Sequence, residues 1–373
     1  MVLIDVSNVA RTLDGMKLTH RKHTFNFNIP GGTSRGMLHT KNSWILSLKD
    51  DDSDFIAIAE CSIIEGLSPE FTEEDKYVQE LDKLLNQLKD TSFSFFFEKN
   101  SLGPQFSKNG LEFLLEWVRF PSIKFGLECA LLSMFHKSNA LIFDNEFSQG
   151  KSTILVNGLV WMGNVSFMQK QIEEQLAQGY STIKLKVGAI DFSSELKIIE
   201  GLRKQLSSEK LAIRVDANGA FSREKVRTSL YELAQLEVHS IEQPIAVGQT
   251  DLLRDLCYEN ILPIALDEEL ISCYSYAEKQ TLLQTVKPQF IVLKPSLHGG
   301  IVGTQEWIQL AEDLNIDWWL TSALEGNIGL LAIAQLAAEY DLKLPQGLGT
   351  GSLYSNNFPS LLVLKNGYVK QVL

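Results

Sequence analysis

From about residue 140 onward, short apolar runs alternate with longer segments in which apolar residues recur at helical spacing. Continuous apolar runs are typical of parallel strands buried on both faces, and the longer period is typical of amphipathic helices. The predicted strands are residues 154–161, 182–187, 211–215, 240–242, 264–266, 290–293 and 318–320. The predicted helices include residues 194–206, 222–236, 304–314 and 327–340. Successive strand ends lie about 25 to 30 residues apart, close to one β/α unit of a barrel.

The first third of the chain follows a mixed pattern. Its predicted elements are strands at residues 43–48 and 55–59 and helices at residues 73–88 and 123–136. Residues 31–37 contain three glycines and are interpreted as a loop. Residues 367–373 are strand-like again and can return to the N-terminal part. A closed barrel is favoured over a doubly wound sheet, because no Gly-x-Gly-x-x-Gly motif follows the first strand.

The composition is that of a soluble globular protein, with 45% hydrophobic and 21% charged residues among 373. This length allows one large and one smaller domain. The net charge of −12 argues against nucleic acid as a partner, because phosphate binding needs a basic surface. The four cysteines form no Cys-x-x-Cys pair, so neither a zinc site nor a disulfide framework is expected. With no signal peptide or membrane span in the sequence, we expect a cytoplasmic protein without a membrane partner.

Charged residues stand at the ends of consecutive predicted strands. In chain order they are Lys184 and Lys186 on one strand, then Asp216, Glu242, Asp267 and Lys294 on the following ones. The carboxyl ends of barrel strands meet at one rim, where the active sites of this fold are built. Because residues i and i+2 of a strand share a face, Lys184 and Lys186 point the same way. The pattern predicts a ring of three carboxylates with lysines on two sides.

Three neighbouring carboxylates repel each other unless a cation lies among them, and a set of oxygen ligands suits Mg²⁺ or Mn²⁺. Such a cation could hold a substrate carboxylate and stabilise the enediolate formed when a neighbouring carbon loses its proton. A lysine acts as a base only when neutral, a form that a second ammonium and a divalent cation favour. Lys186 beside Lys184 meets this requirement, and Lys294 can face the other side of the same carbon.

Each of these residues also has an ordinary interpretation. A Lys-x-Lys pair at a strand end is commonly solvated, and Asn218-Gly219 is typical of a turn. A lone Asp or Glu after a strand commonly caps a helix. Surface residues rarely repeat the order Lys, Asp, Glu, Asp, Lys over five consecutive strand ends, so their joint occurrence favours a site.

These motifs resemble those of the enolase superfamily, of its muconate-cycloisomerase-like branch and, within that branch, of the o-succinylbenzoate synthases. The matching stretches are Ile183-Lys184-Leu185-Lys186-Val187-Gly188, Arg214-Val215-Asp216-Ala217-Asn218, Ile241-Glu242-Gln243-Pro244, Ala265-Leu266-Asp267-Glu268 and Leu293-Lys294-Pro295-Ser296. The resemblance covers most of the barrel and is more specific for the superfamily than for the reaction, because one frame hosts several reactions.

The resemblance implies an α/β fold, a (β/α)7β barrel of the TIM type closed by an α+β capping domain. Residues 1–140 and the tail 345–373 would form the cap, and residues 141–344 would form the catalytic barrel.

The resemblance also implies the chemistry. The implied ligands of Mg²⁺, or of Mn²⁺ as a substitute, are Asp216, Glu242 and Asp267. Lys186 would act as general base and acid, Lys294 would stabilise the enediolate from the opposite side, and Lys184 would tune Lys186. The implied reaction is the syn-dehydration of 2-succinyl-6-hydroxy-2,4-cyclohexadiene-1-carboxylate to o-succinylbenzoate, a hydro-lyase step of menaquinone biosynthesis.

The substrate contacts are also expected from the resemblance. They are Asn218, Thr321, Ser322, Gly347, Gly349 and Arg35, the last within the 31–37 loop that would close over the substrate together with a second loop at 60–66. Residues 346–351 lack the Asp-x-Asp with which dipeptide epimerases hold an amine. The synthases often carry serines in the seventh-strand segment, whereas Ala323 stands here. The glycine-rich stretch and both loops could equally be plain connections.

Two alternatives stay open at this point. An N-acylamino-acid racemase or dipeptide epimerase would use Lys186 and Lys294 as two bases on opposite faces of one carbon. A catalytically inactive binding barrel would have no reason to keep both lysines and all three carboxylates. Both a synthase and a racemase or epimerase would bind a small-molecule carboxylate. The sequence does not determine the oligomeric state.

Overall fold

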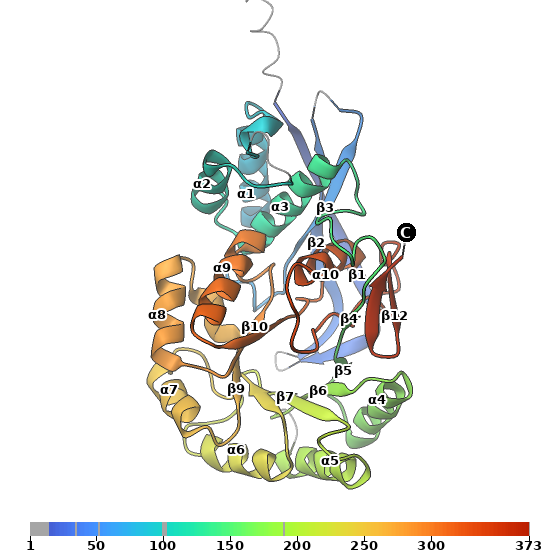
Figure 1. Ribbon diagram of the computed structural model, residues 1–373, viewed down its shortest axis with the longest axis vertical. Coiled ribbons are helices and arrows are strands. Elements are labelled where there is room, and N and C mark those ends of the chain that lie inside the picture. The colour runs from blue at the N-terminus through green and yellow to red at the C-terminus, as the bar shows by residue number, and fades with distance from the viewer. Residues whose placement is uncertain (1–14, 34–35, 51–52, 99–102, 189–190, 373) are drawn as a thin grey trace, which may run out of the picture.

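The computed structural model describes residues 15–33, 36–50, 53–98, 103–188 and 191–372. Within these ranges, an N-terminal sheet with its helices lies above a curved row of parallel strands, whose helices are arranged around the outside (Figure 1). This is the α/β barrel with an antiparallel cap that the sequence predicts.

The cap consists of one antiparallel sheet and the helices packed on it. Its strands are β1 (Lys17–Thr33), β2 (Gly36–Lys49) and β3 (Ile56–Ser62), in that order. Its helices are α1 (Glu74–Leu88), the short 3₁₀ segment Phe93–Phe95, α2 (Lys108–Glu116) and α3 (Pro121–His136). Proline at the first position suits the start of α3, where no backbone donor is needed. Helix α3 is buried along almost its whole length because it packs between the sheet and helix α9 of the barrel.

The barrel strands follow the predicted order. They are β4 (Ile154–Leu155), β5 (Gly158–Val160), β6 (Thr182–Lys186), β7 (Ala212–Asp216), β8 (Ser240–Glu242), β9 (Ile264–Leu266), β10 (Phe290–Leu293) and β11 (Asp317–Leu320). Strands β5 to β11 form one parallel sheet in sequence order. The helices are α4 (Val165–Ala177), α5 (Phe192–Gln205), α6 (Val226–Gln235), α7 (Thr250–Glu259), α8 (Tyr276–Val286), α9 (Gly300–Asp313) and α10 (Asn327–Ala337), with a 3₁₀ segment at Glu268–Ser272.

A short segment closes the barrel between its first and last strands. Gly347 pairs in parallel with Thr321, and Gln346 pairs in parallel with Val156. The Gly347 N–H donates to the carbonyl of Leu320 at 2.7 Å. Seven β/α units followed by a lone strand make the expected (β/α)7β arrangement. The tail range 345–373 is therefore wrong at its beginning, because residues 346–347 pair within the barrel.

The remainder of the C-terminal tail contacts both parts of the molecule. Strands β12 (Leu362–Lys365) and β13 (Tyr368–Gln371) form an antiparallel sheet with β4 at the barrel. Before them, the Asn28 N–H donates to the carbonyl of Leu353 at 2.8 Å, which joins the tail to β1. The tail thus ties the cap to the barrel.

The loop interpretation of residues 31–37 is wrong for its described residues. Gly31 to Thr33 belong to β1 and pair with Gly36 to Leu38 of β2, after a register shift between Asn26 and Gly31. Arg35 lies outside the described residues. The hairpin descends to the barrel near β5 (Figure 1). A Cβ at Gly31 would lie 3.1 Å from the Trp161 ring. Glu60, expected in the second loop, lies in β3.

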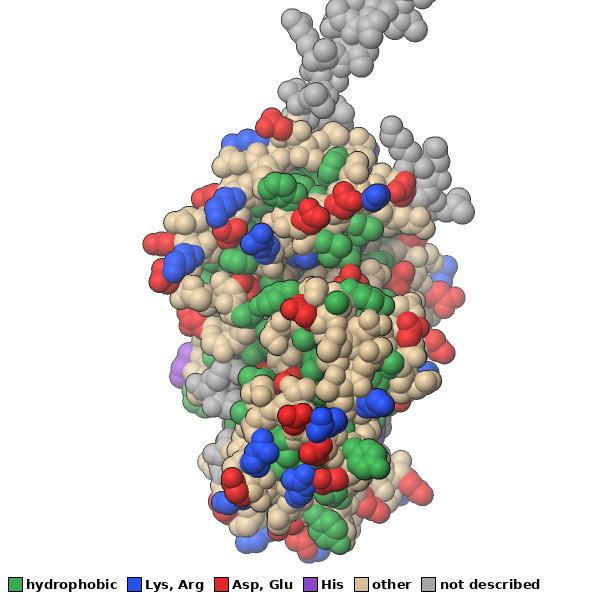
Figure 2. Space-filling view, turned by 90° about the vertical axis from the view of Figure 1, so that its left-hand side faces the viewer, with side chains coloured by type: hydrophobic (Ala, Val, Ile, Leu, Met, Phe, Trp, Pro, Cys, Tyr) green, Lys and Arg blue, Asp and Glu red, His purple; other side chains and the backbone are tan. Residues whose placement is uncertain are grey.

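The surface carries charges of both signs. On the face drawn in Figure 2, acidic and basic side chains are interspersed, with isolated hydrophobic side chains among them. Over the described part of the chain, no helix combines the length and the apolar character that crossing a membrane requires.

Candidate active site

A cavity of about 430 Å³ lies at the carboxyl ends of the barrel strands, below the cap. The cap contributes Leu38 and the segment at 64–67, and the barrel contributes the rest. Among the predicted site residues, the cavity is lined by Lys184, Lys186, Asn218, Lys294, Thr321, Ser322, Gly347 and Gly349. Asp216, Glu242 and Asp267 are almost fully buried and pair with the lysines that face the cavity. The structure thus brings together every predicted site residue that it describes.

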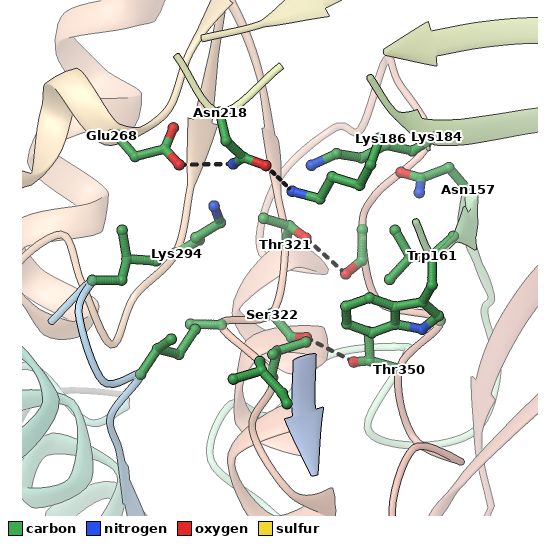
Figure 3. A pocket seen from close by; sticks show the side chains of 18 of the residues that line it. Asn157, Trp161, Lys184, Lys186, Asn218, Glu268, Lys294, Thr321, Ser322 and Thr350 are labelled. Carbon is green, nitrogen blue, oxygen red and sulfur yellow. Dashed lines mark hydrogen bonds between the residues drawn. The ribbon is translucent and has the colours of Figure 1, made fainter. Parts of the chain in front are cut away.

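The strand register explains this convergence. Lys186 is paired with Asp216 on the next strand, and Asp216 is paired with Glu242 on the one after it. In a parallel sheet, residues in register lie side by side on one face. The alternation of β6 directs Lys184 and Lys186 to the same side, where they lie across the cavity from Lys294 (Figure 3).

The lysines hold the carboxylates in a network of ion pairs. Lys184 Nζ lies 2.8 Å from Asp216 Oδ2 and 2.6 Å from Glu242 Oε2. Lys186 Nζ donates to the same Asp216 oxygen at 2.6 Å. On the opposite wall, Lys294 forms a salt bridge with Asp267 and lies 3.8 Å from Glu242 Oε1.

Burial and charge act in opposite directions on these groups. Burial disfavours the charged form of Lys184, but Asp216 and Glu242 outweigh it and raise its pKa. Burial opposes ionisation of Asp216, yet the neighbouring lysines, Lys184 foremost, lower its pKa. Burial, followed by the charge of Asp216, raises the pKa of Glu242 to about 8. The two carboxyls therefore shift in opposite directions: two ammonium groups lie within 2.8 Å of Asp216, whereas Glu242 has one at that distance and is also repelled by the charges of Asp216 and Asp267.

The carboxylates have unused bonding capacity. Glu242 Oε1 and Asp267 Oδ1 are buried without a hydrogen-bond partner in the described structure. Their oxygens, with those of Asp216, are hard donors of the kind that divalent cations prefer. Ammonium groups now lie between the carboxylates, and no set of three or more acidic, histidine or cysteine side chains within the described residues has the spacing of a metal site. The charge and chemistry of these carboxylate oxygens fit a divalent cation, whereas the distances between the carboxylates reflect their ion pairs with the lysines.

Asn218 is fixed by three hydrogen bonds. Its Oδ1 accepts from Lys186 Nζ at 2.6 Å, its Nδ2 donates to Glu268 Oε1 at 2.8 Å, and its backbone N–H donates to Asp216 Oδ1 at 3.0 Å (Figure 3). Its φ of 43° lies in the left-handed region that asparagine tolerates. Asn218 thus positions the Lys186 ammonium at the edge of the cavity.

The opposite end of the cavity carries hydroxyl groups and glycine backbone. Thr321 Oγ1 donates to the carbonyl of Gly347 at 3.0 Å. Ser322 Oγ and Thr350 Oγ1 lie 2.7 Å apart, so one of their two hydroxyl protons is used between them and the other can be donated to a ligand. The Gly349 N–H makes no hydrogen bond within the described residues, whereas that of Gly347 already donates to Leu320.

Several lining residues were not predicted from the sequence. Asn157, Leu159 and Trp161 line the cavity from strand β5 and the residues on either side of it, and Thr350 lies beyond the predicted glycines. The period of two in Asn157, Leu159 and Trp161 is the signal that could have identified them, because alternate strand residues share a face. Gln243 was also missed as a positioning residue, since its Oε1 accepts the backbone N–H of Asp267 at 3.4 Å.

Comparison with known proteins places this geometry in context. Residues 168–371 match the family described as "Enolase C-terminal domain-like". The chain is 42% identical over 370 residues to an o-succinylbenzoate synthase from Desulfotalea psychrophila, covering 95% of this chain and 99% of the relative.

Solved structures give a consistent result. The crystal structure of MenC from Desulfotalea psychrophila superposes with a TM-score of 0.82 at 39% identity, covering 95% of this chain and 99% of that one. The L-Ala-D/L-Glu epimerase from Bacillus subtilis superposes with a TM-score of 0.80 at 19% identity, covering 96% of each chain, which shows the shared fold alone.

Proposed function

The chain belongs to the enolase C-terminal domain-like family, and we propose that it converts 2-succinyl-6-hydroxy-2,4-cyclohexadiene-1-carboxylate to o-succinylbenzoate by syn-elimination of water. One observation carries the proposal: Lys186 and Lys294 face a single cavity from opposite walls, beside three buried carboxylates. Similarity to an o-succinylbenzoate synthase along 95% of the chain supports this reaction over others of the family.

We infer that Mg²⁺ is the resident cation and that Mn²⁺ can substitute for it. Asp216, Glu242 and Asp267 would hold the cation, which is consistent with the unpartnered oxygens of Glu242 and Asp267. When bound, it would attract the substrate carboxylate and stabilise the negative charge that develops when the neighbouring carbon loses a proton. Family membership supports dependence on a divalent cation, and the choice of Mg²⁺ belongs to the proposal.

Lys186 performs both proton transfers in the proposed reaction. In its neutral form, Nζ takes the proton from the carbon next to the substrate carboxylate. The electron pair of that C–H bond is first delocalised into the substrate carboxylate as an enediolate and then forms the new ring double bond as the neighbouring C–O bond breaks. Lys186 returns its proton to the leaving hydroxyl on the same side, so that water departs and the ring becomes aromatic. Because a single base on one face of the ring handles both the proton and the hydroxyl group, both leave from the same side, which makes the elimination syn.

Lys294 acts as a cation in this reaction. It lies across the cavity from Lys186 and is held by Asp267 and Glu242 (Figure 3). A fixed positive charge there stabilises the carbanion-like charge on the substrate without reorganising during the reaction. Lys184 and Asn218 position Lys186 through Asp216 and through the direct amide contact.

The second carboxylate of the substrate, on its succinyl side chain, is assigned to the end of the cavity that carries the hydroxyl groups of Thr321, Ser322 and Thr350. Of the two hydroxyl protons of Ser322 and Thr350, one remains available to donate to this carboxylate, and the Gly349 N–H is a second donor. Thr321 already donates to Gly347, so its oxygen can accept but it has no further proton to give. Trp161 and Leu38 provide apolar surface for the ring.

The test is an absorbance assay with the cyclohexadiene substrate, first with Mg²⁺ and then with excess chelator. Rapid aromatisation that the chelator abolishes supports the proposal. Absence of turnover would overturn it and would direct the search to acylamino acids and dipeptides.

A racemase or epimerase remains the second candidate, because two lysines on opposite walls could each act as a base on one carbon. Lys294→Arg separates the two, since arginine keeps the positive charge but is not a base at neutral pH. Dehydration should survive in part in this variant. Deuterium exchange with inversion of an N-acylamino acid in the wild type, and its loss in Lys294→Arg, would instead favour racemisation.

A further inference from the structure

A second cavity, of about 440 Å³, lies between the cap and the barrel and shares no lining residue with the first. It is formed by the segment leading into α3, the loop after β3, the segment around the start of α8 and the loop between β10 and α9. Its walls include apolar side chains such as Phe120 and Leu297. A cavity of this size can hold a molecule with an apolar ring.

The polar part of this cavity is cationic. Lys124 and Lys279 both line it, with only 7% and 2% of their surfaces exposed, and Arg119 stands at its exposed side. Lys279 is neutralised by Glu306, whose Oε2 lies 2.7 Å from its Nζ. The Lys124 ammonium makes no ion pair or hydrogen bond with any described residue. Glu128 on the same helix acts on its charge from a distance, but the Glu128 carboxylate is hydrogen-bonded to the backbone of α9. A buried ammonium without a partner is costly, and an anion beside it removes that cost.

His298 adds a directed hydrogen-bond donor. It lines the cavity, is 2% exposed, and its Nε2 has no partner among the described residues. Its Nδ1 accepts the backbone N–H of Lys294 at 2.9 Å, so in the neutral ring the proton must be on Nε2. Burial, together with the charges of Lys294 and Lys279, lowers its pKa well below the ordinary value. His298 is therefore neutral, and its Nε2–H has no acceptor among the described residues.

Glu70 is the carboxyl group lining this cavity, and in its ionised form it would repel a bound anion. It lines the cavity, and its Oε1 accepts from the Ser122 hydroxyl at 2.8 Å, while Oε2 is unpartnered. Burial raises its pKa, so the protonated form, which donates a hydrogen bond, is more accessible than for an exposed glutamate. Glu70 is thus compatible with a bound carboxylate.

We propose that this second cavity is a binding site for a small organic carboxylate, with the charged group held by Lys124 and His298 and the apolar body held against Phe120 and Leu297. The two cavities share a wall formed by one apolar cluster, in which Ile64 and Ala323 face the first cavity and Ile271 and Leu297 face the second. Because His298 also binds the backbone of Lys294, occupation of this site alters the position of that lysine, a consequence that rests on the proposed function.

Titration calorimetry with benzoate as the probe tests the site, and it needs no catalytic activity. Benzoate should bind the wild-type chain, and Lys124→Met should weaken its binding by about tenfold or more. The matched control is Lys108→Met, which removes an exposed lysine of the same domain and should change nothing. Lys124→Arg, which keeps the charge, should restore most of the affinity.

Folding is monitored by the melting temperature. Weaker binding by Lys124→Met counts as evidence only if the variant still melts well above the temperature of the titration, because methionine also removes the positive charge that acts on the buried Glu128 carboxylate. Lys186→Met should leave benzoate binding intact. Benzoate binding that is lost in Lys186→Met but kept in Lys124→Met would assign the probe to the first cavity and overturn the proposal.

Two further outcomes also overturn it. The first is the absence of benzoate binding at millimolar concentration. The second is binding of inorganic phosphate, but not benzoate, with the same dependence on Lys124, because the site would then take a simple anion without using its apolar walls. Inhibition or activation of dehydration by benzoate, lost in Lys124→Met, would establish the link to Lys294 separately.

Discussion

Glu60 Oε1 accepts a hydrogen bond from the backbone N–H of Gly326 at 3.0 Å, and this contact joins strand β3 of the cap to the start of helix α10 in the barrel. The other oxygen of Glu60 accepts the N–H of Gly329 at 3.2 Å. A carboxylate at a helix N-terminus is favoured by the unpaired N–H groups and by the helix dipole. Lys41 lies 3.8 Å from Glu60 and completes a buried charge pair within the cap.

Glu60→Ala should lower the free energy of unfolding by about 3 to 5 kcal/mol, because it leaves Lys41 buried without its partner and frees two helix N–H groups. Urea denaturation measures the change. Glu112→Ala is the control, because Glu112 is exposed and its pair with Lys108 is 3.9 Å long, so a change within about 0.5 kcal/mol is expected. Equal effects of the two substitutions would contradict the structural role assigned to Glu60.

Lys186→Ala should reduce kcat for dehydration by about 100- to 10,000-fold, the range that loss of a general base produces. Steady-state kinetics with the cyclohexadiene substrate measure it. Lys210→Ala, which removes an exposed lysine, should leave kcat unchanged. A Lys186→Ala protein that is folded and retains full turnover would remove Lys186 from the mechanism.

Addition of Mg²⁺ to chelator-treated protein should raise its melting temperature. A ligand that binds only the folded state at about a hundredfold excess over its Kd stabilises it by about 2.7 kcal/mol. Asp216→Asn should abolish the increase, because it removes one of the three proposed carboxylate ligands. An unchanged melting temperature in the wild type, or an equal rise in the variant, would count against a cation held by these residues.

The positions of the proposed catalytic groups can be predicted from the sequence because a charged residue directly follows or ends each short apolar run. Glu242 ends a fully buried run, and Lys294 follows a run in which only Phe290 is partly exposed. In each case the charged residue marks the end of the strand. The predicted bounds of β8, β9 and β10 coincide with those in the structure. Any barrel strand buried on both faces carries the same signal.

Other features depend on contacts between distant segments and leave little local trace. Strand β1 was not recognised because much of it is exposed and rich in charged and polar residues, among them Arg21 and Lys22. The closing strand is only a pair of bridges at Gln346 and Gly347, too short to have a period of its own. The second cavity combines segments from around Glu70, Lys124 and His298, which only the packing of cap on barrel brings together.

Stability should depend on pH through Glu128, whose side chain accepts hydrogen bonds from the backbone N–H groups of Ile301 and Val302. Burial, opposed by Lys124 and these hydrogen bonds, raises the pKa of Glu128 from 4.5 to about 7. Between these values the folded state holds a proton that the unfolded state has lost, so stability falls as pH rises from 4.5 to about 7 and is level above it. A shift of this size corresponds to about 3 kcal/mol.

Glu128→Gln removes this titration but keeps an oxygen acceptor. The difference in unfolding free energy between variant and wild type should therefore grow in favour of the variant across that pH range, as chemical denaturation at several pH values can determine. Using the difference cancels other titrating groups such as Glu325, whose pKa is also raised to about 7 by burial. A difference that stays constant with pH would contradict the assignment.

The same substitution at two glycines should have opposite effects. A Cβ at Gly347 would lie 2.1 Å from Thr321 Oγ1 and 2.5 Å from Thr321 Cβ, so alanine there must push Thr321 or the closing strand away. Overpacking of this kind costs about 1 to 3 kcal/mol. Because Thr321 borders the cavity, Gly347→Ala should also raise KM several-fold.

Gly201 lies inside helix α5, with open space where its Cβ would be. Gly201→Ala should raise stability by about 0.5 to 1 kcal/mol, because alanine loses less backbone entropy in a helix, and should leave KM unchanged. Thermal unfolding and steady-state kinetics on both variants measure the contrast. If Gly347→Ala behaved like Gly201→Ala, the close contact between Thr321 and Gly347 could not be what shapes this end of the cavity.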